Sequence, residues 1–246
     1  MDFLLHTPPT SDQIINDGDS DITYEEHDGK QYAVLYTDGS TVNGKSFWNA
    51  SAAWSIFVAE GHKANRAYKL DHELQCNFRA ELRAVAECFK ICGAPIYIKS
   101  DCKGVVTIAQ EIIDGRREFG DAANDDILKV MCSLAEHAPK DHIKIKWIPS
   151  HLLDKNAGKK KQTFLDKGGT IEEILGNDGA DKLANAMATC IEVDAVYHTI
   201  AEAKKHVTKI AQNMMVHIWC KHRGYIGDQK LENLSEYWIR RRGRPV

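Results

Sequence analysis

The stretch from Tyr32 to Ser40 constrains this chain more than any other. It reads Tyr-Ala-Val-Leu-Tyr-Thr-Asp-Gly-Ser, and its run of β-branched and aromatic residues predicts a buried strand. We expect Asp38-Gly39 to stop that strand abruptly, which presents a carboxylate at its carboxyl end, where open α/β sheets bind their ligands. A carboxylate is costly to bury alone. The expected burial of Asp38 therefore predicts that a cation or another polar partner lies nearby.

Composition narrows the class of protein. The chain has 246 residues, of which 43% are hydrophobic, enough for one sizeable core. Its seven cysteines include no CxxC pair, so they suggest neither a zinc site nor a disulfide framework, and they fit buried thiols in a reducing compartment. The sequence shows no signal-peptide pattern and no apolar stretch of transmembrane length. We expect an intracellular protein, nuclear or cytoplasmic, with no membrane partner.

Three regions are expected along the chain. Residues 1–28 combine prolines and many carboxylates with few large apolar groups, which predicts a disordered acidic lead-in. Residues 29–190 form the principal domain, with an inserted basic loop at 152–175 that has at most a short helix near its end. Residues 191–246 form a helical extension with an arginine-rich basic tail.

The order of the predicted elements gives the fold class. Strand patterns occur at 32–38, 52–59, 66–74, 96–100 and 143–148. Helical patterns occur at 77–92, 103–114 and 124–138 and from 176 onward. This order predicts an α/β fold with a five-stranded mixed sheet flanked by helices, its first three strands forming an antiparallel meander.

A long amphipathic helix is predicted from Val193 to about Lys221, because apolar residues recur there in alternating steps of three and four. Such a stripe fits a coiled-coil seam or a helix that packs against its own domain, and we favour the second interpretation. A protein partner for this helix and the oligomeric state are both left open.

Four carboxylates are candidates for chemistry. Asp38 and Asp101 each end a strand, and Glu81 falls on the apolar stripe that Phe78 begins. Asp181 falls in the first turn of the helix predicted from 176, where the helix dipole favours a negative charge. Four carboxylates in one place would repel one another unless divalent cations neutralised them, and such oxygen ligands suit Mg²⁺, with Mn²⁺ as the alternative. Two ions about 3.5 to 4 Å apart would hold both the attacking and the leaving oxygen of a phosphodiester, which predicts a two-metal phosphodiesterase.

Five motifs follow one another through the principal domain. They are Thr37-Asp38-Gly39-Ser40, Arg79-Ala80-Glu81-Leu82, Ser100-Asp101, Trp147-Ile148-Pro149-Ser150-His151 and Gly176-Asn177-Asp178-Gly179-Ala180-Asp181-Lys182-Leu183-Ala184. In this order they resemble the type I ribonuclease H family, particularly the domains that retroelements carry. The resemblance implies an RNase H-like fold, here with an added long C-terminal helix. It also implies hydrolysis of the RNA strand of RNA/DNA hybrids, which leaves a 5′-phosphate and a 3′-hydroxyl.

The resemblance also assigns roles to residues. Asp38 would bridge two Mg²⁺ ions, Glu81 and Asp101 would complete one metal site, and Asp181 would complete the other. His151 would assist proton movement or product departure. Asp178 competes with Asp181, but the Ala-Asp-x-Leu-Ala ending aligns Asp181 with the family's aspartate.

Substrate contacts are implied at Gly39, Ser40 and Asn77. The family's usual threonine and second amide beside this asparagine are here Cys76 and Phe78, which puts its DNA-phosphate pocket in question. The basic protrusion that some members carry is also missing. We expect a lysine cluster beside His151 to supply the phosphate contacts instead, since each such contact adds salt-sensitive affinity. Its members are Lys155, Lys159, Lys160 and Lys161.

Two other kinds of function were weighed. Proofreading-type exonucleases of the same superfold place a glutamate where this chain has Ser40, and transposases take their helix carboxylate late in the chain, unlike Glu81. Both fit poorly. The remaining alternative is an RNase H-like binding or assembly module of a larger complex with little or no catalysis. The residues are compatible with a free-standing enzyme and with a piece of a retroelement polyprotein.

Overall fold

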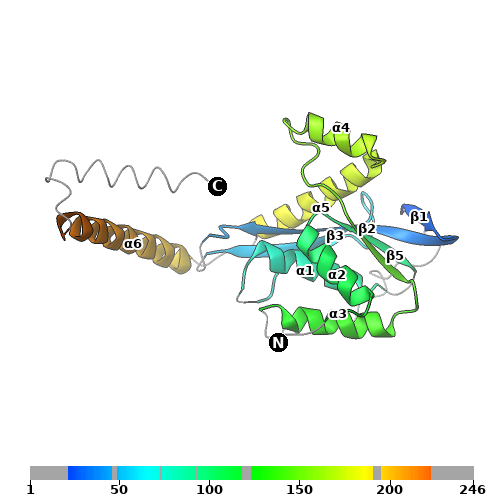
Figure 1. The fold of residues 1–246 in the computed structure, drawn as a ribbon, viewed down its shortest axis with the longest axis horizontal. Helices are drawn as coiled ribbons and strands as arrows, with labels where there is room; N and C mark the ends of the chain where they lie inside the picture. The colour runs from blue at the N-terminus through cyan, green and yellow to red at the C-terminus, as the bar shows by residue number, and fades with distance from the viewer. Residues whose placement is uncertain are drawn as a thin grey trace. The chain divides into compact units, whose positions relative to one another are not determined.

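A mixed β-sheet organises the larger, N-terminal part of the chain (Figure 1). The computed structural model describes residues 22–45, 49–72, 74–91, 94–117, 123–190 and 195–222. Its strands are β1 (Tyr24–His27), β2 (Lys30–Val42), β3 (Ser51–Phe57), β4 (Arg66–Lys69), β5 (Ile96–Ser100) and β6 (Ile143–Trp147). They lie in the order β4-β3-β2-β5-β6, with β1 also paired to β2. Because β2 is antiparallel to β3 and parallel to β5, the predicted mixed sheet is confirmed, with one strand more than expected.

The additional strand, β1, lies inside the segment predicted to be disordered. It pairs antiparallel with the start of β2 through a turn at Asp28 and Gly29, whose φ angles are 55° and 74°. Two positive φ angles in an Asp-Gly pair are typical of a tight hairpin turn. The prediction missed this hairpin because Tyr24-Glu25-Glu26-His27 lacks an apolar alternation. The rest of the predicted lead-in, residues 1–21, lies outside the described residues.

Strand β2 does not end at Asp38, so that prediction is wrong. Its antiparallel ladder with β3 continues to Val42, whereas its parallel ladder with β5 ends where Thr37 faces Ser100. Because β3 extends further along β2 than β5 does, β2 loses its neighbour β5 first. Asp38 therefore lies at the point where β2 passes beyond the end of β5, which opens space on that side of the carboxylate.

Six helices complete the described part of the chain. They are α1 (Asn77–Cys88), α2 (Lys103–Ile113), α3 (Asp125–His137), α4 (Gly158–Asp166), α5 (Ile171–Cys190) and α6 (Ala195–His222). Helices α1 to α3 cover one face of the sheet, and α5 covers the other (Figure 1). Successive side chains of β2 point to opposite faces of the sheet. Leu35 belongs to the core with α1 to α3, whereas Val34 and Tyr36 pack with Ala180 of α5.

Helix α5 begins at Ile171, five residues before the predicted start at Gly176. A β-carbon on Gly176 would lie 2.2 Å from the ring of Tyr36, and one on Gly179 would lie 2.8 Å from the ring of Phe57. These glycines therefore let the helix lie directly on aromatic side chains of the sheet, and they do not mark its start. Asp181 consequently lies in the middle of this 20-residue helix, so the prediction that it belongs to the first turn is wrong and the helix-dipole argument does not apply to it.

The segment 152–175, predicted as a loop with at most a short helix near its end, contains all of α4 and the first turn of α5. The ring of Phe164 occupies the space beside Gly169, where a β-carbon would lie 2.4 Å away. This contact closes the turn between the two helices. Sequence analysis missed α4 because its run of lysines has no pronounced apolar stripe, and none of its residues is buried.

The chain divides into two compact units, residues 1–193 and 194–246, and α6 belongs to the second. Helix α6 agrees closely with the long helix expected from 193 to 221. Across the described residues, no helix combines the length and the apolar composition that crossing a bilayer requires.

Candidate metal centre

Three carboxylates from separate elements meet where β2 passes beyond the end of β5. Asp38 comes from β2, Glu81 from α1, and Asp101 from the residue that follows β5. Each offers one carboxylate oxygen, and these three oxygens all lie within 4.8 Å of one another. Asp38 and Glu81 are only 6% and 3% exposed, so the cluster is largely removed from water.

Burial and mutual repulsion make this cluster hard to ionise. Burial raises the pKa of Asp38 to about 8, and the charges of Asp101 and Asp181 add to the effect. The pKa of Glu81 is well above its usual range, because of burial and then the charge of Asp38. Burial also raises the pKa of Asp101. A divalent cation would reverse this balance by favouring the charged forms.

Two features of the cluster suit a hard cation. The oxygen Oε2 of Glu81 is buried and has no hydrogen-bond partner. The backbone N–H of Gly39 interacts with the carboxylates of both Asp38 and Glu81 and holds them side by side. A buried oxygen without a donor is costly unless something binds it. Carboxylate oxygens at this spacing are ligands that Mg²⁺ and Mn²⁺ prefer.

Asp181 approaches the cluster from α5 but does not belong to the closest three carboxylates. Its charge raises the pKa of both Asp38 and Asp101, so it lies near both of these carboxylates. Ser55, which faces Asp38 across the β2–β3 ladder, donates a hydrogen bond of 2.7 Å to the carbonyl oxygen of Ala180. This bond ties the residue before Asp181 to the strand beside Asp38.

Asp178, the competing candidate, has another partner. Its carboxylate forms an ion pair of 2.6 Å with Lys182 on the exposed side of α5. Asp181 instead accepts a hydrogen bond of 2.8 Å from Nδ2 of Asn185. The oxygen of Asn185 in turn accepts a hydrogen bond from Ser40. Ser40, predicted as a substrate contact, thus reaches toward Asp181 through Asn185.

Two asparagines of α5 that sequence analysis did not select contact the carboxylates. Asn177 is 6% exposed, and its Nδ2 donates to Oδ2 of Asp101 at 3.3 Å, while its own oxygen is buried without a partner. Asn185 holds Asp181. Asn177, Asp181 and Asn185 follow one another at intervals of four residues, so they share one face of the helix. This four-residue spacing is visible in the sequence and could have identified the two asparagines as neighbours of Asp181.

The motif that ends in His151 joins the cluster from β6. Trp147 donates a hydrogen bond of 2.9 Å from Nε1 to the carbonyl oxygen of Asp101, which fixes the end of β6 against the end of β5. His151 is exposed and has a φ of 55°. Its charge acts to lower the pKa of Asp101, against the effect of burial, so it lies near that carboxylate. His151 is therefore an exposed group beside a buried cluster.

The start of α1 differs from its prediction. Asn77 is exposed, as a substrate contact requires, but Phe78 is also 38% exposed and does not belong to the inward stripe. The next residue, Arg79, takes the interior position: it is fully buried, pairs with Asp126 of α3, and donates a hydrogen bond of 3.1 Å to the carbonyl oxygen of Ala123. A buried guanidinium whose two terminal nitrogens are bound this way determines the rotation of the helix.

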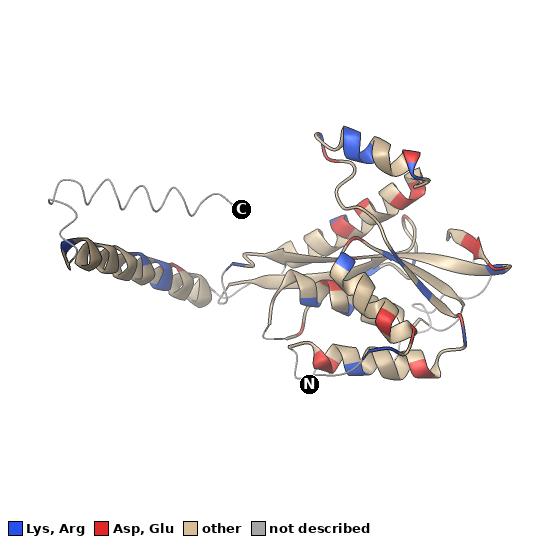
Figure 2. Cartoon of the chain, in the orientation of Figure 1, with Lys and Arg blue, Asp and Glu red and all other residues tan. Residues whose placement is uncertain are grey.

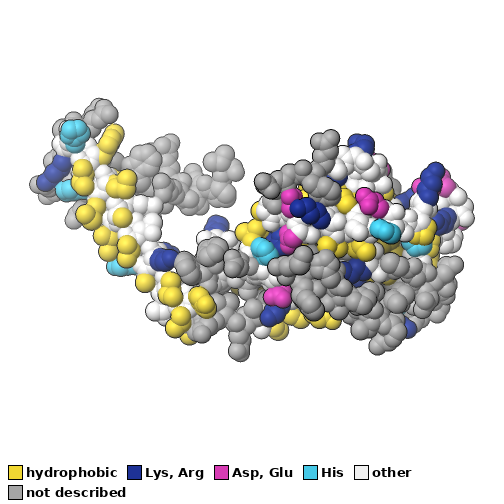
Figure 3. All heavy atoms as spheres, turned by 90° about the horizontal axis from the view of Figure 1, so that it is seen from below, with side chains coloured by type: hydrophobic (Ala, Val, Ile, Leu, Met, Phe, Trp, Pro, Cys, Tyr) yellow, Lys and Arg dark blue, Asp and Glu magenta, His cyan; other side chains and the backbone are white. Residues whose placement is uncertain are grey.

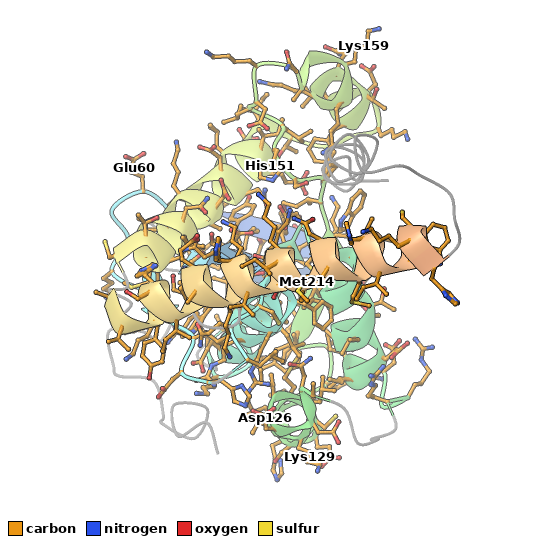
Figure 4. The ribbon with its side chains drawn as sticks, turned by 90° about the vertical axis from the view of Figure 1, so that its left-hand side faces the viewer. Glu60, Asp126, Lys129, His151, Lys159 and Met214 are labelled. Carbon is orange, nitrogen blue, oxygen red and sulfur yellow. The ribbon has the colours of Figure 1, made fainter. Side chains whose placement is uncertain are left out.

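The lysine cluster lies on and before α4. In the cartoon of Figure 2, the blue that marks Lys and Arg covers part of this short helix. Lys160 donates a hydrogen bond of 2.6 Å to the carbonyl oxygen of Ser150, the residue before His151. In Figure 4, Lys159 lies on α4 with its side chain directed outward. The cluster is thus anchored next to His151, and most of its cationic groups are exposed to solvent.

Comparisons with known proteins give one family match and several similar solved structures. The sequence model of the RNase H family matches residues 30–189. Among solved structures, the chain is similar to the prototype foamy virus protease-reverse transcriptase, with 21% identity and a TM-score of 0.48, over 68% of this chain and 22% of that one. It is also similar to the PFV RNase H domain, with 21% identity and a TM-score of 0.45, over 65% of this chain and 95% of the domain.

A third similar structure is RNase H1 from the halophilic archaeon Halobacterium salinarum, with 16% identity and a TM-score of 0.37, over 63% of this chain and 95% of that one. The chain spans about a fifth of the length of the foamy virus protein. No match was found among curated protein sequences.

Proposed function

Because this chain belongs to the RNase H family, we propose that it is an endoribonuclease that cleaves the RNA strand of RNA/DNA hybrids with two divalent metal ions. Family membership confirms the predicted RNase H-like fold and supports a nuclease that acts on such hybrids. The observation that carries the specific proposal is the meeting of Asp38, Glu81 and Asp101, with one oxygen of each within 4.8 Å of the others.

The carboxylates fit the metal ions that the proposal requires. Asp38 would bridge two Mg²⁺ ions, with Glu81 and Asp101 at one and Asp181 at the other. Bound Mg²⁺ would supply positive charge that stabilises the oxygens of the phosphodiester during displacement. Asn177 holds Asp101 and Asn185 holds Asp181, so both carboxylates are oriented before a metal ion binds.

His151 is proposed to move a proton or to assist product departure. Its exposure and its position in the connection between β6 and α4 leave the ring accessible to solvent and substrate. Its electrostatic effect on Asp101 supports a position near the carboxylate cluster. A positioned acid or base of this kind contributes roughly a hundredfold or more to a rate.

The direct test is a cleavage assay on an RNA/DNA duplex labelled on either strand, with single-stranded RNA and DNA duplex as comparison substrates. We expect Mg²⁺-dependent cleavage of the RNA strand alone, with 5′-phosphate and 3′-hydroxyl ends. Asp38→Asn should abolish cleavage while the circular dichroism spectrum stays that of the folded protein. Hybrid binding without Mg²⁺-dependent cleavage would instead support the non-catalytic binding module.

The lysine cluster is proposed to bind substrate phosphates. Changing Lys155, Lys159, Lys160 and Lys161 together to Ala should raise KM and flatten its dependence on salt, because each phosphate contact contributes to the salt slope. A control that changes Lys129 and Lys140 to Ala tests general charge loss, since both are exposed and lie on α3 and just before β6, away from His151. An unchanged salt slope in the first variant would contradict the lysine proposal without affecting the nuclease proposal.

A further inference from the structure

Helix α6 carries a regular stripe of exposed apolar side chains, whose yellow groups follow the helix in Figure 3. The stripe begins at the half-buried Ile200 and continues through the exposed side chains of Ala203, Val207, Ile210, Met214 and Ile218. Val207, Met214 and Ile218 are 64%, 58% and 62% exposed. Ile200, Val207 and Met214 repeat every seven residues, and Ala203 and Ile210 repeat at the same interval between them. The next position of this second series, seven residues after Ile210, is His217. The apolar stripe continues instead at the following residue, Ile218.

Charged side chains lie away from this stripe. At 100° per residue, Lys205 and Lys209 fall on the opposite side of the helix from Val207 and Met214. Lys205 forms an ion pair of 3.3 Å with Glu202, which also faces away from the stripe. From residue 200 to residue 218 the stripe therefore contains no Lys, Arg, Asp or Glu that an apposed surface would have to bury.

The period of the stripe indicates what covers it. A helix with an apolar repeat of seven residues matches another helix with the same repeat, because slight supercoiling keeps the two seams in contact along their length. A second copy of α6 meets this requirement without any further partner.

Length and area are sufficient for such a pair. The helix has 28 residues, which corresponds to about 42 Å. Covering this stripe on two helices would remove on the order of 1,000 Å² of surface from water, close to the smallest area that specific interfaces bury. An interface of this size predicts a dimer that dissociates on dilution.

We propose that α6 pairs with α6 of a second copy of this chain in a two-stranded coiled coil. This pairing links two catalytic units in one assembly through their C-terminal helices. It is independent of the proposed nuclease function, since it depends on none of the carboxylates.

The test measures the mass of the full chain by sedimentation and light scattering over a range of concentrations. The unmodified chain should form a dimer with a dissociation constant in the range of about 1 to 100 µM. Val207→Glu, which places a charge in the seam, should raise that constant at least a hundredfold. Gln212→Glu is the matched control, because it introduces the same side chain on the opposite side of α6 and should leave the dimer intact.

Two further measurements keep the outcome clear. Val207→Ile retains an apolar β-branched side chain in the seam and should preserve the dimer. Mixing tagged and untagged chains should yield mixed dimers, which the Val207→Glu chain does not join. A chain that stays monomeric at about 100 µM would overturn the proposal. A Val207→Glu chain that dimerises like the unmodified chain would also overturn it. The same holds if the substitution lowers the thermal stability of a monomeric chain, because the stripe would then pack within that chain.

Discussion

A β-carbon at Gly39 would lie 2.4 Å from the backbone nitrogen of Glu81. Strand β2 and helix α1 therefore touch backbone to backbone at the point where the carboxylates of Asp38 and Glu81 meet. Gly39 is needed for this close approach. In the pair Asp38-Gly39, one residue supplies a carboxylate and the next lets a second element bring its own carboxylate beside it.

Gly39→Ala should therefore separate α1 from β2. The atoms that the new methyl group would meet are mostly backbone, so they cannot move aside as a flexible side chain would. We expect a loss of about 2 kcal/mol or more in the free energy of unfolding, together with weaker Mg²⁺ binding. Denaturant unfolding and calorimetric titration measure the two effects. Gly158→Ala is the matched control, because no atom lies within 4 Å of its added β-carbon, and it should change stability by no more than about 0.5 kcal/mol.

Asp181 and Asp178 should differ sharply when each is changed to Asn. Asp181 acts electrostatically on Asp38 and Asp101, whereas Asp178 pairs with Lys182. Asp181→Asn should weaken Mg²⁺ or Mn²⁺ binding and lower hybrid cleavage by about a hundredfold or more. Asp178→Asn should leave both nearly unchanged. Equal losses in the two variants would show that the Ala-Asp-x-Leu-Ala alignment misassigns the ligand.

Asn177 should act by holding Asp101. We expect Asn177→Ala to lower metal affinity or kcat by about 10- to 100-fold, with KM for the hybrid nearly unchanged. A wholly structural role would instead lower thermal stability and leave kcat of the folded fraction intact. Lys182→Ala on the same helix is a suitable control, since its ammonium group is exposed and pairs with Asp178.

Without metal, the protein should become less stable as pH rises. The pKa of Asp38 in the folded state is about 8, above its ordinary value of 3.8. Between these values the folded state binds more protons than the unfolded state, so the free energy of unfolding falls with increasing pH. Glu81 and Asp101 shift in the same direction. Thermal unfolding in EDTA should give a higher Tm at pH 5.5 than at pH 8, and Mg²⁺ should raise Tm more at pH 8. Asp38→Asn should reduce this slope.

The buried end of α5 should depend on Lys99 more than on Lys146. Glu173 is 2% exposed and accepts hydrogen bonds from Lys99 at 2.7 Å and from Lys146 at 2.8 Å. Burial would raise the pKa of Glu173, but these bonds hold it below its usual range. Lys99→Met breaks a fully buried pair and should cost about 3 kcal/mol. Lys146→Met removes a side chain that is 41% exposed and should cost less than about 1 kcal/mol. Comparable losses would contradict the assignment.

Sequence by itself determined the fold class and most of its elements. The strands at 96–100 and 143–148, the helices near 103–114 and 124–138, and the long helix near 193–221 all agree with the structure to within a few residues. Periodicity succeeds for these elements because it reports which face of a strand or helix is buried, and that is a local property of the sequence. The order of the five motifs likewise identified the family.

Tertiary structure decided the role of residues whose meaning depends on what lies opposite them. In the sequence, Gly176 predicted the start of a helix. In the structure it lies inside α5, where the absence of a side chain leaves room for the ring of Tyr36. Phe78 has an apolar side chain, yet Arg79 occupies the interior because Asp126 is there to pair with it. Asn177 and Asn185 acquire their roles from Asp101 and Asp181. A close approach, an ion pair or a hydrogen bond joins residues far apart along the chain, and the local pattern around either residue does not encode its partner.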